Sequence, residues 1–314
     1  MSIKIENLTK YYGINPAVKD ISFEVKTGEI VGFLGPNGAG KTTTMKLITT
    51  YLAQNSGKIF VDGIDTEVDA LAVRKKIGYL PEQNPLYSDM NVIDYLRYAA
   101  ELQSVDKTMI NDSVKKMVKV CGLDDVKHKD IGELSKGYKQ RVGLAQAMIH
   151  NPDVLLLDEP TSGLDPNQII EIRKLIKDLG KHKTLVLSTH ILQEVQATCD
   201  RVIIINKGQI VADGTTDSLQ KKFQGQLALS LTLKKDAKAG KEKIISMFES
   251  VKGVDKVRIV SDDADVWNID ISASKESDVR DEVFKKVVSN DMVLLNLHQE
   301  ETSLEDIFRK LTTH

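Results

Sequence analysis

Apolar residues follow two kinds of pattern over the first 220 residues of this chain. Continuous apolar runs, such as residues 30–34 and 154–157, are typical of strands buried on both faces of a parallel sheet. A helical pattern separates two such runs, from about residue 167 to 179. Strand character is expected at residues 3–8, 17–25, 30–34, 154–157, 184–187, 201–206 and 209–212. This mixture of strands and helices predicts an α/β domain over residues 1–220.

A purely helical pattern replaces the strands between about residues 88 and 150. Val92, Leu96 and Ala99 share one face of a helix, and Val114 and Val118 repeat the spacing further along the chain. The sequence therefore predicts an all-helical insertion within the larger domain.

The pattern changes again after residue 220. Alternating apolar residues predict a strand at 227–233, and Ile244, Phe248 and Val251 predict a helix after it. Continuing to residue 297, the order is strand, helix, strand, strand, helix, strand. This order predicts a small α+β ferredoxin-like domain over residues 221–314, with a short final helix.

Composition narrows the possible classes of protein. The 314 residues carry a formal net charge of −2, so we expect no nucleic-acid partner. Cys121 and Cys199 form neither a disulfide framework nor a metal-ligand spacing, which suits the reducing cytoplasm. No apolar run approaches the roughly 18 residues that a membrane span needs. We therefore expect a cytoplasmic chain that reaches a membrane only through a partner.

The most specific motif is a glycine-rich loop that fits Gly-x4-Gly-Lys-[Ser/Thr] and joins a predicted strand to a predicted helix. Glycines let backbone N–H groups turn around a β-phosphate, and the helix N-terminus adds partial positive charge. Lys41 is expected to reach the β- and γ-phosphates, and the Thr42 hydroxyl to bind Mg²⁺. The expected nucleotide-binding residues are Gly35, Pro36, Asn37, Gly38, Ala39, Gly40, Lys41, Thr42 and Thr43.

Two acids, Asp158 and Glu159, end another apolar run. A buried strand can deliver Asp158 to the Mg²⁺ site, where a carboxylate suits a hard cation. Glu159 can polarise a water molecule for attack on the γ-phosphate. Alone, the pair fits a solvated strand end equally well. Together with the glycine-rich loop it predicts nucleotide hydrolysis.

Residues 134–141, Leu-Ser-Lys-Gly-Tyr-Lys-Gln-Arg, resemble the Leu-Ser-Gly-Gly-Gln signature of the ATP-binding cassette (ABC) family. Other family motifs occur in the expected order, including Tyr12, a D-loop that ends at Asp165, and a Ser-Thr-His motif that ends at His190. The resemblance covers the whole first domain. It implies a P-loop NTPase cassette with a RecA-like core, an antiparallel β subdomain and the helical insertion. It also implies ATP as the nucleotide, with Tyr12 stacked on adenine and His190 contacting the γ-phosphate.

The chain departs from the family pattern in two places. In the signature, Lys136 replaces the middle glycine and Tyr138 replaces the glutamine. At the Q-loop, the aligned position is Glu82, and Gln83 follows one residue late. The residue that contacts water and metal therefore stays open between Glu82 and Gln83.

The resemblance implies a homodimer, or a pseudo-homodimer, formed head to tail around two ATP molecules. Ser135 and Gly137 of one subunit then complete the ATP site whose catalytic residues, Lys41, Glu159 and His190, belong to the other. It also implies a separate membrane permease that docks near residues 82–97. The chain would then lie peripherally on the inner face of the cell membrane.

Residues 80–87, 134–143 and 163–168 resemble the ATPase subunit of bacterial gliding-motility-associated transporters, within the exporter class. The predicted function is the ATP-hydrolysing motor of an ABC transporter, in export or gliding motility. The alternative is a soluble ABC ATPase that acts on a macromolecular complex without a transporter. Neighbouring genes for a polytopic permease would favour the first prediction over the second.

Overall fold

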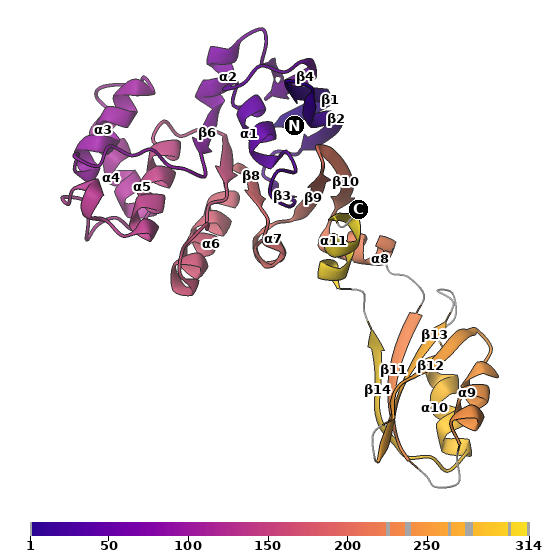
Figure 1. Cartoon of the computed structure of the whole chain (residues 1–314). Helices are drawn as coiled ribbons and strands as arrows, with labels where there is room; N and C mark the ends of the chain where they lie inside the picture. Colours follow the sequence, from indigo (N-terminus) through magenta and orange to yellow (C-terminus); the bar gives the residue numbers. More distant parts are fainter. Residues whose placement is uncertain are drawn as a thin grey trace. The chain divides into compact units, whose positions relative to one another are not determined.

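Two compact units divide the chain in the computed structural model, which describes residues 2–223, 227–235, 240–262, 265–273, 279–300 and 303–312. The first unit comprises Met1–Leu219 together with Phe308–His314, and the second comprises Gln220–Ile307. Three β-sheets are present in the described residues, two in the first unit and one in the second (Figure 1).

A six-stranded sheet forms the centre of the first unit, in the order β10-β9-β3-β8-β7-β6. Its neighbouring strands are parallel except for β9 and β10, which form the predicted hairpin. The strands are β3 (Ile30–Leu34), β6 (Ile77–Leu80), β7 (Val154–Asp158), β8 (Thr184–Thr189), β9 (Arg201–Asn206) and β10 (Gln209–Gly214). Every residue of β3, β7 and β8 is buried, which explains their continuous apolar sequence.

Helices of the first unit connect these strands. They are α1 (Lys41–Ile48), α2 (Ala70–Lys76), α6 (Pro166–Gly180), α7 (Leu192–Thr198) and α8 (Thr216–Phe223), which runs past Leu219 into the second unit. The helix predicted at about residues 167–179 is confirmed as α6, and the Asp165 side chain caps its N-terminus by accepting from Asn167 N and Gln168 N.

A four-stranded antiparallel sheet, in the order β2-β1-β4-β5, completes the first unit. Its strands are β1 (Ile3–Tyr12), β2 (Asn15–Val25), β4 (Ser56–Val61) and β5 (Ile64–Asp65). One apolar cluster joins it to the central sheet, and the rings of Phe23 on β2 and Phe33 on β3 lie 5.6 Å apart. The expected antiparallel β subdomain is therefore present and packs on the strand that carries the glycine-rich loop.

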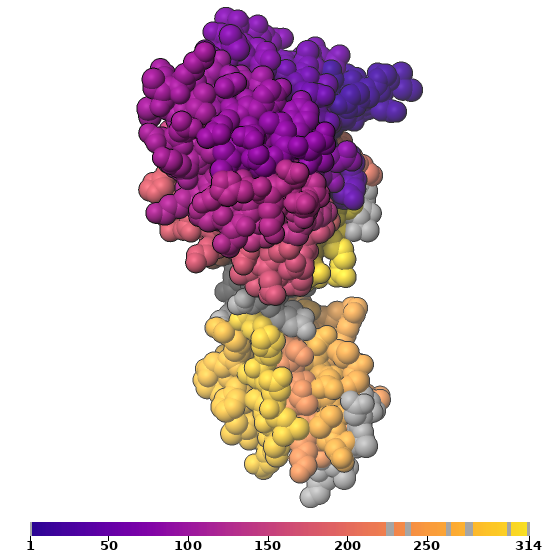
Figure 2. Space-filling view, turned by 90° about the vertical axis from the view of Figure 1, so that its left-hand side faces the viewer, coloured from indigo at the N-terminus to yellow at the C-terminus, as the bar shows by residue number. Residues whose placement is uncertain are grey.

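The predicted helical insertion is present as α3 (Val92–Leu102), α4 (Ile110–Val120) and α5 (Lys136–Met148), with a short 3-10 helix, η1 (Ile131–Glu133). Figure 2 views the first unit from the side of these helices, which form a continuous surface in purple and magenta. Val92, Tyr95 and Leu96 are buried in the core of the insertion. Residues 82–97 are the segment expected to dock a permease, and the sequence pattern suggests these three side chains as its apolar contacts. That interpretation is wrong, because the same helical stripe packs α3 on α4 and α5.

The second unit has the predicted order of elements. They are β11 (Leu227–Lys234), α9 (Lys241–Glu249), β12 (Val254–Asp262), β13 (Val266–Ala273), α10 (Arg280–Ser289) and β14 (Leu294–Glu300). The strands pair antiparallel in the order β12-β13-β11-β14. Side chains from α9, α10 and the sheet form a separate core that includes Phe248, Trp267 and Val283.

The final helix, α11 (Leu304–Thr312), crosses the division between the units. The sequence pattern assigns residues 221–314 to one domain, whereas the structure groups Phe308 and the residues after it with the first unit. There the Asn206 side-chain amide, at the end of β9, donates to the Leu311 carbonyl at 3.2 Å.

Candidate active site

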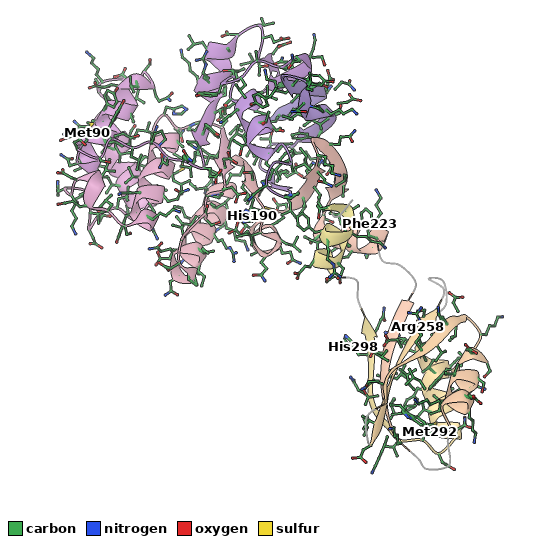
Figure 3. All side chains as sticks on the ribbon, viewed as in Figure 1. Met90, His190, Phe223, Arg258, Met292 and His298 are labelled. Carbon is green, nitrogen blue, oxygen red and sulfur yellow. The ribbon has the colours of Figure 1, made fainter. Side chains whose placement is uncertain are left out.

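Three strands deliver the predicted site residues to one edge of the central sheet. β3, β8 and β7 are adjacent and parallel, so their carboxyl ends meet at this edge. In this register Leu34 pairs with Thr189, and Asp158 pairs with Ser188. The glycine-rich loop after β3, the acids at the end of β7 and His190 after β8 are thereby brought together. His190 lies on the loop between β8 and α7 (Figure 3).

The glycine-rich loop passes very close to neighbouring backbone. At Gly35 a Cβ atom would lie 2.4 Å from the Ile205 carbonyl oxygen. Gly40 has a φ of 109°, in the left-handed region, and a Cβ there would lie 2.5 Å from the Ala17 carbonyl oxygen. α1 begins directly after Gly40, so the first N–H groups of the helix have no intrahelical acceptors. They are available to an anion at this helix N-terminus.

A cavity of about 390 Å³ lies over this loop and the end of β7. Its lining includes most of the predicted phosphate-binding residues together with both members of the Glu159–His190 pair. The lining residues are Ala17, Asn37, Gly38, Gly40, Lys41, Thr42, Thr43, Glu82, Glu159, Ser162 and His190.

Lys41 places a buried ammonium group at the floor of this cavity. Its Nζ donates to the carbonyl oxygens of Gly35 at 2.8 Å and Pro36 at 3.3 Å, and lies 3.5 Å from Glu159 Oε1. Only 6% of Lys41 is exposed. A buried cation with carbonyl acceptors and one carboxylate can exchange these partners for phosphate oxygens.

Glu159 and His190 form a direct pair. His190 Nδ1 lies 3.1 Å from Glu159 Oε1 and 3.0 Å from Oε2. Glu159 is buried and its backbone has a φ of 48°, in the left-handed region. Its backbone N–H donates to the Ser188 carbonyl at 3.1 Å and lies 3.2 Å from Ser188 Oγ. The carboxylate is therefore fixed at the cavity by backbone, lysine and histidine contacts together.

Asp158 offers an oxygen atom that fits a metal ion. The side chain is completely buried, and its Oδ1 accepts a hydrogen bond from Ser188 Oγ. Its Oδ2 is buried and has no hydrogen-bond partner among the described residues. Such an orphaned carboxylate oxygen is costly unless a cation or water satisfies it. Thr42 and Asp158 line the same second cavity, so the donor set suits a hard divalent cation.

This second cavity, of about 590 Å³, is lined by Thr42 and by residues 81–85 around the Q-loop. Glu82 lines both cavities, whereas Gln83 lines only the second. Tyr79 also lines the second cavity, and burial raises the pKa of its phenol, which keeps the hydroxyl neutral.

Apart from Gly35, Pro36 and Ala39 of the glycine-rich loop, four predicted site residues line neither cavity among the described residues: Tyr12, Ser135, Gly137 and Asp165. Tyr12 is half exposed at the end of β1. Ser135 is exposed and caps α5 by accepting from Tyr138 N, and Asp165 caps α6. The Lys136 amine lies 2.0 Å from where a Cβ on Gly163 would be, so this departure from the family signature contacts the chain's own D-loop.

The sequence did not single out Ser188 as a site residue. Its hydroxyl donates to Asp158 Oδ1, and its backbone carbonyl accepts from Glu159 N, so it orients both acids. The available signal was its position, a hydroxyl residue two places before His190 in the Ser-Thr-His motif.

Comparison with known proteins agrees with this architecture. Residues 18–162 match the sequence family described as ABC transporter. YxlF of Bacillus subtilis, described as an uncharacterized ABC transporter ATP-binding protein, is 34% identical to this chain over 98% of the chain and 99% of its own length. The chain belongs to the ABC transporter family. Within that family it is an ATP-binding subunit and an ATPase.

Two further relatives of this ABC ATPase match it over nearly its whole length. The linearmycin resistance ATP-binding protein LnrL of Bacillus subtilis is 31% identical over 99% of the chain and 98% of its own length. The bacitracin transport ATP-binding protein BcrA of Bacillus licheniformis is 32% identical over 98% of the chain and 96% of its own length. Because both matches extend past residue 220, the likeness is not confined to the first unit.

A solved structure shares the cassette fold. It is described as the dimeric post-hydrolysis state of an ATP-binding cassette bound to ADP and Pi, with a TM-score of 0.63, 25% identity, and coverage of 68% of this chain and 98% of that one. Among the described residues of this ABC ATPase, no helix has the length and apolar character to cross a membrane.

Proposed function

We propose that this ATPase hydrolyses ATP at the Glu159–His190 pair and so drives export through a separate membrane permease. The observation that carries the proposal is this pair, with contacts of 3.0 and 3.1 Å, at the cavity formed by the phosphate-binding loop. Glu159 polarises the attacking water as general base, and His190 orients Glu159 and contacts the γ-phosphate. Lys41 and free backbone N–H groups of the glycine-rich loop and of the start of α1 hold the phosphates.

The remaining site residues take roles around this centre. Thr42 and Asp158 hold Mg²⁺, which when bound neutralises charge on the β- and γ-phosphates. The orphaned Oδ2 of Asp158 supports this assignment. Tyr12 stacks on adenine, and Glu82 serves at the Q-loop, since it lines both cavities whereas Gln83 lines one.

We propose further that two copies pair head to tail around two ATP molecules. Ser135 and Gly137 lie outside the described lining of their own chain's cavity, yet α5 begins between them. The first N–H groups of this helix and the exposed Ser135 hydroxyl suit an anion. In a dimer they would close over the partner's γ-phosphate, while Asp165 and its D-loop lie at the interface.

Relatives named for linearmycin resistance and bacitracin transport support export as the process. The narrower resemblance to gliding-motility transporters is not supported by these names and stays a prediction. The same names weigh against a soluble ATPase without a transporter. The permease partner would hold the chain at the inner face of the membrane.

The docking surface for the permease is proposed on the outer side of α3. There Tyr87 is 54% exposed, and its ring packs edge-on against Tyr98, with centroids 5.6 Å apart. Leu102, at the end of α3, is 66% exposed. These exposed residues replace the buried Val92, Tyr95 and Leu96 as the apolar contacts for an amphipathic helix of the permease.

For the second unit we propose a ferredoxin-like accessory domain. The strand order β12-β13-β11-β14, with antiparallel pairing throughout and a helix in each crossover, supports this assignment. The two relatives named for linearmycin resistance and bacitracin transport match through this region, so its role would be one that exporter ATPases share.

The Glu159→Gln variant tests the function. It removes the general base but keeps the size of the side chain, so hydrolysis should fall by about 10² to 10⁴-fold while ATP binding persists. ATP should then hold the dimer, seen as a doubled mass in sedimentation with ATP and Mg²⁺. Hydrolysis at the wild-type rate by Glu159→Gln would show that Glu159 is not the general base. A variant that stays monomeric in saturating ATP would contradict the proposed dimer.

A further inference from the structure

Glu194 is a buried carboxylate that none of the roles above uses. It lies in the first turn of α7, and only 3% of it is exposed. It is not among the described residues that line either cavity. A carboxylate buried this deeply needs hydrogen-bond donors or a positively charged partner. The partners of Glu194 therefore indicate its role.

Two threonine hydroxyls donate to this carboxylate. Thr161 Oγ1 donates to Oε1, and Thr189 Oγ1 donates to Oε2 at 2.7 Å. Both threonines are buried, with 3% and 0% exposed. A guanidinium nitrogen of Arg173, on α6, lies 3.9 Å from Oε1 and balances the charge. Two donors and one cation make a satisfied buried site.

The two threonines flank the proposed catalytic pair. Thr161 follows Glu159 by two residues, and Thr189 directly precedes His190. Thr189 Oγ1 also accepts from the Ile191 N–H at 3.0 Å, which ties the chain on both sides of His190. The Glu159 and His190 side chains contact each other on the cavity side. On the buried side, Glu194 binds Thr161, which follows Glu159, and Thr189, which precedes His190. The two segments are therefore joined on both sides.

We propose that Glu194 is a positioning residue for hydrolysis, which holds the loop after Glu159 and the end of β8 before His190 at the spacing that lets the two side chains meet. The inference rests on the function proposed above. Glu159 needs such an anchor because its φ of 48° is a backbone conformation that persists only where the surroundings fix it.

A carboxylate suits this task better than any neutral side chain. It offers two acceptor oxygens, one for each threonine hydroxyl. Glutamine keeps the shape but only one acceptor oxygen, and alanine keeps neither. The variants Glu194→Gln and Glu194→Ala therefore weaken the hydrogen bonding between the two segments in two steps.

The experiment measures the ATPase activity of the full chain against Mg-ATP concentration for Glu194→Ala, Glu194→Gln and Thr161→Val. Thr198→Val is the matched control, because Thr198 lies on the same helix, is 5% exposed, and its hydroxyl has no hydrogen-bond partner among the described residues. Thermal unfolding of each variant reports its folding. Valine has the shape of threonine, so Thr161→Val removes the hydroxyl bond and little else.

Glu194→Ala should lower kcat on the order of 10²-fold, the effect of a misplacement of about 1 Å in a catalytic site. Its KM for ATP should stay within about twofold, because phosphate binding does not use Glu194. Thr161→Val should lower kcat without changing KM, Glu194→Gln should restore part of the loss, and Thr198→Val should match the wild type. The Glu194→Ala/Thr161→Val double variant should lose no more than Glu194→Ala alone.

Wild-type kcat in both Thr161→Val and Glu194→Gln overturns the inference. So does a loss seen only as a lower melting temperature, with kcat per folded molecule unchanged. If Glu194→Ala does not fold, the Thr161→Val and Glu194→Gln variants decide the question. Glu159→Gln, run in parallel, separates the two proposals. If Glu159→Gln hydrolyses ATP at the wild-type rate, the proposed function fails. If it is inactive while the Glu194 variants are fully active, only the positioning role fails.

Discussion

Gly143, in the middle of α5, lies directly beneath the Q-loop, and this contact supports a quantitative prediction. A Cβ at residue 143 would lie 1.9 Å from Asn84 Nδ2 and 2.7 Å from Leu80 Cδ1. The Asn84 amide uses this space to donate to the Lys139 carbonyl at 3.2 Å. The missing side chain therefore lets the Q-loop fasten onto the helix that begins with the signature motif.

Gly143→Ala should break this attachment. The new methyl group forces the Asn84 amide to move by about 1.5 Å to reach an ordinary contact distance, which is too far to keep its hydrogen bond. Overpacking of this kind costs about 1–3 kcal/mol in the free energy of unfolding. For a unit of this size, each kcal/mol lowers the melting temperature by roughly 2–4 °C. Asn84→Ala alone should cost about 1 kcal/mol, the worth of one hydrogen bond.

A double-mutant cycle isolates the contact. In Asn84→Ala the methyl group of Gly143→Ala no longer overlaps the amide, although Leu80 Cδ1 stays close to it. The double variant should therefore be more stable than the sum of the single losses predicts, by more than about 0.5 kcal/mol. Unfolding of the full chain by heat and by urea measures each corner. Gly240→Ala is the control glycine, because a Cβ there meets no atom of the described residues within 4 Å.

Additive losses would refute the reasoning, since they would mean that Asn84 does not fill the space above Gly143. ATPase rates of the same variants carry the second readout. Gly143→Ala should lower kcat more than Gly240→Ala, because it displaces a loop next to Glu82, which lines the first cavity. Equal kcat values in Gly143→Ala and Gly240→Ala would show that the contact between Gly143 and Asn84 does not affect catalysis.

Three further predictions follow from the same geometry. Mixing inactive Ser135→Arg with inactive Lys41→Ala should restore part of the ATPase activity, because their heterodimer holds one intact site; activity no higher than the sum of the parts, with heterodimers demonstrated, contradicts the trans role of Ser135. Charge reversal beside the exposed Tyr98 surface, Arg97→Glu, should weaken recovery with native membranes but leave the basal ATPase rate unchanged; recovery equal to the wild type would reject this docking surface. Burial raises the pKa of the Cys121 thiol to about 12, so its thiolate is scarce at neutral pH. Alkylation of Cys121, measured by mass spectrometry, should therefore require unfolding of the chain. Rapid labelling of the native chain would show instead that the helical insertion opens.

Much of the fold was predictable because burial leaves a local pattern in the sequence. β3, β7 and β8 are continuous apolar runs since every one of their residues is buried. The stripe on α3 shows why the same reasoning failed for the docking surface. Val92 and Leu96 are completely buried, and an apolar stripe does not tell which partner covers it, the same domain or another protein.

The end of the chain shows a second limit. The pattern from residue 304 to 311 predicts a helix, and α11 is present, but nothing in its sequence says which unit it joins. Its later half groups with the first unit and accepts a hydrogen bond from Asn206, 105 residues earlier in the chain. Local periodicity predicts an element, whereas long-range contacts decide its domain.

The candidate site was predictable where motifs follow strands, and less so where residues act through one another. Parallel strands bring Asp158, Glu159 and His190 to one edge, as the sequence suggests. Ser188 and Glu194 were missed because a serine at a strand end and a glutamate in a short helix are common. Only the hydrogen bond to Asp158 reveals the role of Ser188. Likewise, only the hydrogen bonds from Thr161 and Thr189 reveal the role of Glu194.

The residues outside the cavity complete the argument about assembly. Lys41 Nζ lies 3.5 Å from Glu159 Oε1, and both residues line the first cavity, so the phosphate-binding half of the site is built within one chain. Ser135, by contrast, is exposed, and the Gln168 side chain occupies the space above Gly137, with its carboxamide carbon 2.6 Å from where a Cβ would be. The N–H groups of this exposed helix N-terminus suit an anion. In the proposed dimer, a second copy would offer such an anion in the ATP that we propose binds at Lys41. Pairing that buries Ser135 against this phosphate would satisfy both surfaces, and hydrolysis at Glu159 would then weaken the contact that holds the two chains together.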